Sequence, residues 1–320
     1  MTSVANQLIL SLSKQYSRAE HINGIPQKQS SLPDALTYIY NPSWDTNSDN
    51  APYEILTQIM DCYYCLPERP DLATLFCWQA INHSYNEYSL SDSAIIDMLK
   101  DSEGIDRLIK KIENNFSVYK GYLVPYIKAL PDKAYRFVAS YILKGYVIDR
   151  NNMGLKYANQ SYKQFKKRHV DLYDVIARTY GDILFKNSTP TCTHNHLHLH
   201  ADQNQNRRLT YSLASNLRKL VEEGSAEFEM HDGSKEEITF TDIQSLGFVI
   251  RFILYASRCS NFHGNVASRL NSDNAREKTF EMYTNMFLLE YMLLAISLHI
   301  QGYLTDECLN NLKSNEDLLL

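Results

Sequence analysis

The chain has 320 residues, of which 44% are hydrophobic and 22% charged, with a formal net charge of -5 at pH 7. This is the composition of an ordinary folded globular protein. The negative net charge excludes an overall attraction to nucleic acid, so any polyanion site has to be local. The six cysteines show no disulfide framework, and the N-terminus lacks the basic start and uninterrupted apolar core of a secretion signal. We therefore expect a cytoplasmic protein with no membrane-spanning segment.

Residues 1–51 are rich in serine, asparagine and proline, and their prolines separate short apolar stretches. Proline interrupts helices and strands alike. We interpret residues 1–51 as an irregular arm rather than a packed unit, and we place the start of the compact body, residues 52–320, near Pro52.

From Pro52 onward, apolar residues recur with a helical period through most of the chain. The stretches predicted to be helices on this ground are 53–66, 70–88, 92–115, 119–130, 131–149, 155–185, 209–223, 241–260 and 272–301. The most apolar run, Met286 to Ile300, is shorter than the roughly 20 residues that cross a bilayer, so we predict a core helix there. The pattern predicts an all-α fold.

Two features interrupt the helices between residues 186 and 240. The stretch from Asn187 to Arg208 is polar and contains Pro190, which predicts a loop or the edge of an insertion. Between Ala226 and Phe240 an Asp-Gly pair separates two short alternating stretches, which predicts a small β-hairpin. We therefore expect one helical domain over residues 52–320 with an insertion around 186–240.

Four histidines alternate with other residues in this predicted loop: His194, His196, His198 and His200. On an extended chain they would share one face, and imidazole is a good ligand for zinc, copper and nickel. No carboxylate or thiol is interleaved, so a solvated loop is the favoured interpretation and a metal site the alternative. We expect no bound cofactor.

A basic cluster with interleaved aromatic residues lies on the helix predicted over residues 155–185. Its members are Lys163, Lys166, Lys167 and Arg168. Such a surface could follow RNA phosphates while aromatic rings stack on bases. The favoured interpretation is a solvated helix face with its aromatic rings turned to the core, and an RNA-binding surface is the alternative.

The helix predicted over residues 241–260 is apolar around nearly its whole circumference, so we expect it to be buried. Arg258 lies near its end. A buried guanidinium needs a partner, from the protein or from a ligand, because it cannot lose its proton. Since Asn261 and the glycine at position 264 suit capping conformations, we expect the helix to end at Ser260 or Asn261 and His263 to turn back toward Arg258.

Arg258 and His263 would together supply an anion-binding fork and a group that titrates near neutrality. These are the groups needed to cut RNA without metal. The 2′-hydroxyl attacks the adjacent phosphorus, the imidazole transfers a proton, and the guanidinium stabilises charge on the phosphoryl oxygens. One histidine serves one proton transfer at a time, so a symmetric dimer that brings two such turns together would complete the site.

The string Tyr-Ala-Ser-Arg-Cys-Ser-Asn-Phe-His-Gly-Asn, from Tyr255 to Asn265, resembles the R-x4-6-H signature of HEPN domains (higher eukaryotes and prokaryotes nucleotide-binding). A second stretch, Leu72 to Tyr85, resembles the earlier HEPN helix that often reads Trp-x-Ala-Phe-Asn-x-x-Tyr. About 170 residues separate the two matches, more than a simple four-helix bundle needs, which again favours an insertion between them. The resemblance implies a HEPN-like bundle with additional helices that dimerises, and endoribonuclease activity in many members, with toxin, anti-phage defence or RNA-processing roles.

The resemblance assigns catalysis to Arg258 and His263. Cys259 stands where the family often has a polar residue, so Asn261 is an auxiliary candidate. Asn82 lies on an apolar helical stripe and could orient the Arg258 turn, with a structural core amide as the alternative.

The partners expected on the same basis are RNA as substrate and a second copy of the chain, with the active site at the interface of the homodimer. An antitoxin or regulatory protein is a further expected partner. The alternative to a nuclease is a catalytically inactive HEPN module that binds RNA or a protein partner, which Cys259 favours.

Overall fold

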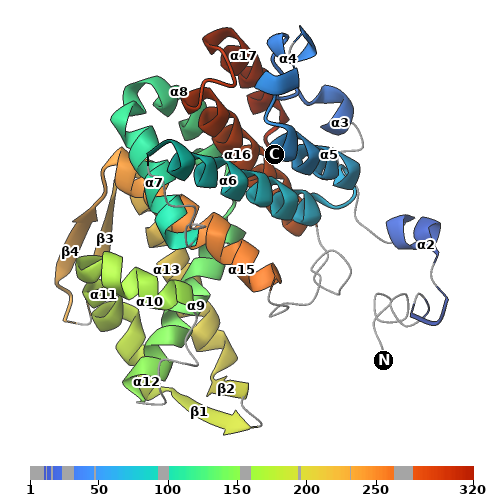
Figure 1. Cartoon of the computed structure of the whole chain (residues 1–320). Coiled ribbons are helices and arrows are strands. Elements are labelled where there is room, and N and C mark those ends of the chain that lie inside the picture. Colours follow the sequence, from blue (N-terminus) through green and yellow to red (C-terminus); the bar gives the residue numbers. More distant parts are fainter. Residues whose placement is uncertain are drawn as a thin grey trace. The chain divides into compact units, whose positions relative to one another are not determined.

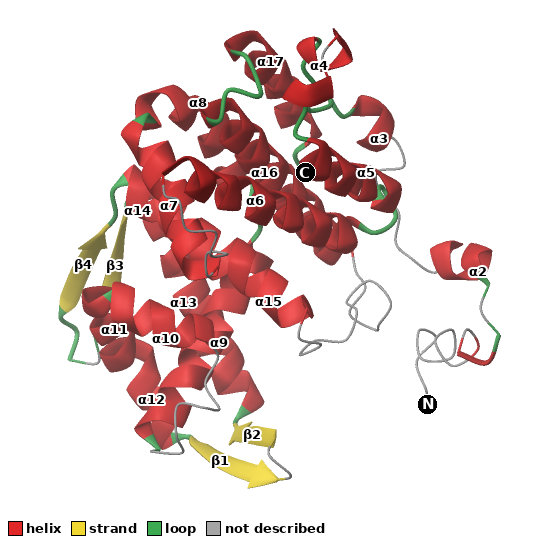
Figure 2. Cartoon of the chain, in the orientation of Figure 1, coloured by secondary structure: helices red, strands yellow, loops and turns green. Residues whose placement is uncertain are grey.

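The computed structural model of the chain is mostly helical, and the strands it describes form two two-stranded sheets (Figures 1 and 2). It describes residues 11, 13–15, 17–23, 32–46, 48–92, 101–151, 160–193, 196–230, 232–262 and 277–320. The chain divides into two compact units: unit 1 comprises Met1–Pro131 and Ser257–Leu320, and unit 2 comprises Asp132–Ala256. The predicted all-α character is confirmed.

Unit 1 is an assembly of helices from both ends of the chain. Its elements are α2 (Arg18–Asn23), α3 (Leu32–Ala35), α4 (Ser43–Thr46), η1 (Ser48–Asn50), α5 (Tyr53–Cys65), α6 (Pro70–Asp92), α7 (Asp101–Asn114), α8 (Phe116–Lys128), most of α15 (Ala256–Phe262), α16 (Glu277–Ile300), α17 (Asp306–Asn311) and η5 (Leu312–Leu318). Helix α16 packs against α6 and α8, and α5 packs against α6.

Helix α16 forms the centre of unit 1 because it is apolar on all sides, as a buried helix is. By length and composition it could cross a membrane, but 89% of its apolar window is buried inside the protein. The core helix predicted over Met286 to Ile300 is therefore confirmed. One polar contact links it to α6, where the hydroxyl of Ser84 lies 2.7 Å from that of Ser297 in α16.

The structure differs from the expected arm over residues 32–46, which pack into unit 1. Leu36 and Ile39 are buried. The backbone N–H of Thr37 donates to Oδ1 of Asn315 at 2.7 Å, and the Asn315 amide donates back to the Thr37 carbonyl at 3.0 Å. The prolines do keep the helices here short. The apolar residues between them are nevertheless enough to bury the segment.

Unit 2 consists of helices and both hairpins. Its elements are α9 (Asp132–Arg150), α10 (Gln160–Arg168), α11 (Val170–Ile176), η3 (Ala177–Gly181), α12 (Asp182–Lys186), β1 (Ser188–Thr193), β2 (His196–Ala201), α13 (Gln203–Glu223), β3 (Ser225–Glu229), β4 (Lys235–Thr239), α14 (Asp242–Phe248) and η4 (Val249–Tyr255). Both η3 and η4 are π-helical turns. Helix α9 packs against α13 and η4.

The segment expected as an insertion, residues 186–240, lies within unit 2. The hairpin predicted between Ala226 and Phe240 is confirmed as β3 and β4. A second hairpin, β1 and β2, takes the place of the predicted loop. Pro190 is compatible with it, because each strand of a two-stranded sheet is an edge strand.

The helix predicted over residues 155–185 is interrupted, and the described part runs from α10 through α11 and η3 to α12. The first break is at His169, whose backbone is not helical (φ -125°, ψ 61°). The break places the His169 ring in a cluster of phenylalanines, 5.6 Å from Phe165 and 5.2 Å from Phe240 between ring centroids. Burial of this ring explains why the periodicity does not continue as one helix.

Candidate active site around Arg258

Arg258 lies near the end of a helical run from Asp242 to Phe262. A capping box starts the run: Oγ1 of Thr241 accepts from the Gln244 N–H, and the Gln244 side chain accepts from the Thr241 N–H. The π-helical turn Val249–Tyr255 follows. A π turn contains more residues than an α turn, so it rotates the side chains that follow it about the helix axis, and such turns are frequent at functional sites.

The guanidinium of Arg258 has a protein partner, as burial of this helix requires. Its Nη1 lies 3.4 Å from Oδ2 of Asp101, the first residue of α7. The Arg258 side chain is 20% exposed and that of Asp101 is 35% exposed. The pair is therefore held by the fold and still accessible to a ligand.

Two residues of α6 continue this ion pair as a series of polar contacts within unit 1. The Tyr85 hydroxyl lies 3.4 Å from Oδ1 of Asp101 and hydrogen-bonds to Oδ1 of Asn82. Tyr85 is fully buried. We call Asn82, Tyr85, Asp101 and Arg258 the polar chain.

Gly104 makes the polar chain sterically feasible. A Cβ at this position would lie 2.1 Å from Cε2 of Tyr85. Only a residue without a side chain lets the α7 backbone lie against the Tyr85 ring, and this places Asp101, one helical turn earlier, at the Tyr85 hydroxyl. Neither Asp101 nor Gly104 was predicted from the sequence as part of the site. The signal that could have found them is an isolated glycine inside a helical pattern, which usually has a packing reason.

The predicted turn after Arg258 is described only in part. Helix α15 includes Asn261 and continues to Phe262, so the expected end at Ser260 or Asn261 is too early. His263 lies outside the described residues, and so does the predicted bend that would carry it toward Arg258.

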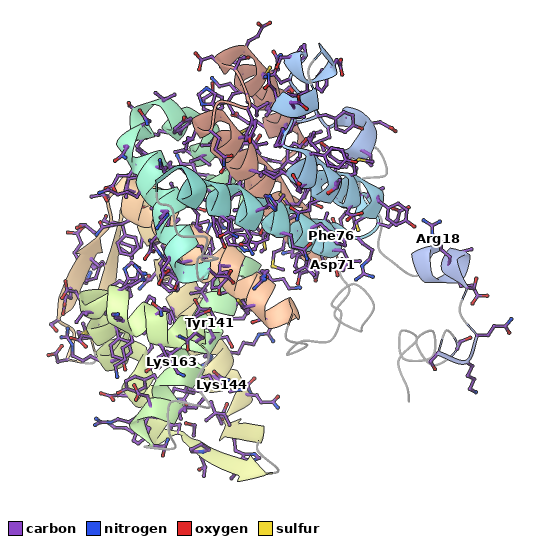
Figure 3. All side chains as sticks on the ribbon, in the orientation of Figure 1. Arg18, Asp71, Phe76, Tyr141, Lys144 and Lys163 are labelled. Atoms are coloured by element: carbon purple, nitrogen blue, oxygen red, sulfur yellow. The ribbon has the colours of Figure 1, made fainter. Side chains whose placement is uncertain are left out.

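The basic cluster on α10 is partly neutralised. Nζ of Lys166 lies 2.6 Å from Oδ2 of Asp149 and 5.1 Å from the centre of the Tyr173 ring. Tyr162 and Phe165 are buried, so these two rings offer no stacking surface. Lys167 and Arg168 are exposed, and Lys163 of the same helix is half-buried. Figure 3 labels Lys163.

His196, His198 and His200 occupy alternating positions of strand β2, the extended segment expected for them. His194 lies outside the described residues. The His200 ring hydrogen-bonds to the Thr191 hydroxyl, Nε2 to Oγ1, at 2.9 Å. Within the described residues, no group of three or more His, Cys, Asp or Glu side chains is arranged to hold a metal ion.

The polar chain connects the two segments whose sequences resemble HEPN motifs, since α6 contributes Asn82 and Tyr85 and α15 contributes Arg258. The Asn82 side chain thus has the hydrogen-bond partner that its place among apolar residues requires. No family model, no curated protein and no solved structure matches the chain.

Proposed function

We propose that the chain is a metal-independent endoribonuclease of the HEPN type, with Arg258 and His263 as its catalytic residues. The observation that supports the proposal is the polar chain. It joins residues of both HEPN-like motifs to one accessible guanidinium, although Arg258 and Asp101 are 157 positions apart in sequence.

In the proposed reaction, the 2′-hydroxyl of RNA attacks the adjacent phosphorus. A 2′,3′-cyclic phosphate forms and the 5′-oxygen of the next nucleotide leaves. Arg258 binds the non-bridging oxygens and stabilises their growing charge, a task that suits its fork of donors. His263 takes the proton from the 2′-hydroxyl or gives one to the leaving oxygen. Asp101 acts as a positioning residue for Arg258, and Tyr85 connects it to Asn82, while Asn261 is an auxiliary candidate.

A homodimer is part of the proposal, because one His263 serves only one of the two proton transfers. Two copies meeting at a two-fold axis would face each other with the same residues and supply the second histidine. A regulatory protein or antitoxin that covers Arg258 would block the anion site. A role as a toxin or in defence against phage follows from the resemblance alone.

The second candidate function is a HEPN-like module that binds RNA or a protein without cutting. The observation that favours it is Cys259, whose Sγ lies 3.9 Å from Nη1 of Arg258. A thiol is a weaker hydrogen-bonding group than the polar side chain that the family often has there.

The test incubates mixed single-stranded RNA with wild type, Arg258→Ala and His263→Ala in the presence of a chelator. Arg178→Ala is the matched control, because Arg178 is an exposed arginine already paired with Glu236 at 2.7 Å. The wild type and the control should cut, and both site variants should be slower by about 100-fold or more. The proposal fails if the site variants cut as well as the wild type. Binding without cutting, lost in Arg258→Ala, would establish the second candidate instead.

A further inference from the structure

Two arginines of unit 2 converge on one exposed tyrosine. Tyr211 of α13 is 43% exposed. Nη1 of Arg136, from α9, donates to the Tyr211 hydroxyl at 2.6 Å, and its guanidinium carbon lies 4.6 Å from the ring centre. Arg207, one helical turn before Tyr211, lies 5.4 Å from the same ring centre and donates to the hydroxyl at 3.5 Å.

In the part of the chain that the structure describes, no carboxylate lies within ion-pairing distance of Arg136 or Arg207. The neighbouring Arg218 is different, since it pairs with both Asp132 and Glu222. Two like charges beside one hydroxyl repel each other, and an anion bound between them would offset this repulsion. Their effect is visible in the pKa of Tyr211, which the hydrogen bond from Arg207 and the charge of Arg136 lower.

The same two helices carry further exposed cationic groups. Lys144 is exposed on α9, eight residues after Arg136, with the exposed Ser140 midway between them. Residues four apart lie on nearly the same face of a helix, about 6 Å apart along its axis. Lys144, which Figure 3 labels, is therefore about two turns from Arg136 along α9. Arg208 is exposed on α13 beside Arg207.

We infer that Arg136, Arg207 and Tyr211 form a binding site for the phosphodiester backbone of single-stranded RNA. Guanidinium forks bind phosphate oxygens in a bidentate manner. The Tyr211 hydroxyl can donate to the same phosphate, and an exposed aromatic ring offers a surface for a base. A phosphopeptide has one phosphate to bind, whereas the further cations Lys144 and Arg208 suit a ligand with repeated phosphates. The identity of the anion as RNA rests on the proposed function.

This site belongs to unit 2, whereas the polar chain belongs to unit 1, so binding can be measured apart from cutting. The probe is a fluorescent 2′-O-methyl RNA of mixed sequence, which lacks the attacking hydroxyl and cannot be cut by the proposed mechanism. Fluorescence anisotropy should show that the Arg136→Ala/Arg207→Ala double variant binds the probe at least about tenfold more weakly than wild type does. The plot of log K against log salt should also be shallower by about 1.4, because each lost contact to a single strand releases about 0.7 of a counterion.

Three controls make the result specific. Arg178→Ala removes a paired arginine of the same unit and should bind within about twofold of wild type. Arg136→Lys/Arg207→Lys keeps the charge and should recover part of the binding. Thermal melting should be nearly the same for all these variants because the side chains are at the surface.

The inference is overturned if the double variant binds the probe as tightly as Arg178→Ala, or if it loses affinity for a phosphotyrosine peptide and not for RNA. Wild type that binds the probe through Arg136 and Arg207 yet leaves unmodified RNA intact would support this site and refute the nuclease proposal. If wild type cuts RNA while the double variant binds the probe normally, the nuclease proposal is supported and the site at Arg136 and Arg207 is refuted.

Discussion

Nη1 of Arg258 lies 3.4 Å from Oδ2 of Asp101, and this ion pair places a carboxylate where an RNA phosphate would have to bind. Asp101 positions the guanidinium, and under the proposed function it would also compete with the RNA phosphate for it. Substitution of Asp101 can separate the two roles. Positioning depends on the geometry that Asp101 gives to Arg258, whereas competition depends on the negative charge of Asp101.

Asp101→Asn should strengthen binding of 2′-O-methyl RNA about two- to fivefold, which corresponds to the ~0.5–1 kcal/mol of a partly exposed ion pair. Glu103→Gln is the matched control, since it removes the same charge from an exposed position of the same helix. Anisotropy titrations of the two variants make the comparison. Equal strengthening by both would mean that only the overall charge matters.

Gly104→Ala should destabilise unit 1 by about 1–3 kcal/mol, because the new methyl group would collide with the Tyr85 ring. Gly121→Ala in α8 is the opposite case: nothing lies within 4 Å of its Cβ position. Alanine there should stabilise the helix by about 0.5–1 kcal/mol. Urea unfolding of both variants tests the pair. A Gly104→Ala protein as stable as wild type would refute the close approach of α7 to Tyr85.

Glu290 of α16 is 1% exposed, and burial raises its pKa well above 4.5. The unfolded chain ionises this carboxyl near pH 4.5, whereas the folded chain keeps it protonated to higher pH. Its contribution to stability is thus fully present below pH 4.5 and is lost as the pH rises, by at most about 1.4 kcal/mol per pH unit.

Glu290→Gln keeps the shape and removes this ionisation. Relative to wild type, the variant should become steadily more stable between pH 5 and pH 8 in urea titrations. Glu281→Gln, on the same helix but partly exposed, should show no such trend. A constant difference between Glu290→Gln and wild type across this range would contradict a buried neutral carboxyl.

Burial lowers the pKa of His169 from 6.5 to about 4, with smaller contributions from the charges of Arg251 and Arg168. The unfolded chain binds a proton at this ring below pH 6.5 and the folded chain does not. Stability should therefore fall as the pH is lowered from 6.5 to about 4, by up to about 3 kcal/mol.

In His169→Phe an aromatic ring remains in the phenylalanine cluster but cannot take up a proton. Its melting temperature should fall less than that of wild type over the same acidic range. His200→Ala, at an exposed position of β2, should follow wild type. Parallel acid curves for His169→Phe and wild type would show that this ring does not control the acid sensitivity.

The helices of the core could be predicted because burial alone creates their pattern. Apolar periodicity indicated α5, α9 and α16 close to their observed bounds. The β3–β4 hairpin could be predicted from its Asp-Gly turn. The start of α13 at Gln203 was missed, although Asp202 caps it by accepting from the N–H groups of Asn204 and Gln205.

The features that could not be predicted depend on contacts between distant segments. The break at His169 arises from a phenylalanine cluster to which Phe240 and Phe248 contribute from far along the chain. Arg258 needed a partner on physical grounds, but no local pattern identifies Asp101 as that partner. Only the packing of α7 against Tyr85 brings the two residues together.

The most direct test of the nuclease proposal is the fate of an RNA in which the nucleotide at a mapped cleavage position carries a single 2′-deoxy substitution. If the 2′-hydroxyl is the nucleophile, wild type in chelator cuts the unmodified RNA to a 2′,3′-cyclic phosphate and leaves the substituted position intact, while Arg258→Ala cuts neither. Cleavage at the substituted position, or a strict requirement for a metal ion, would contradict the account.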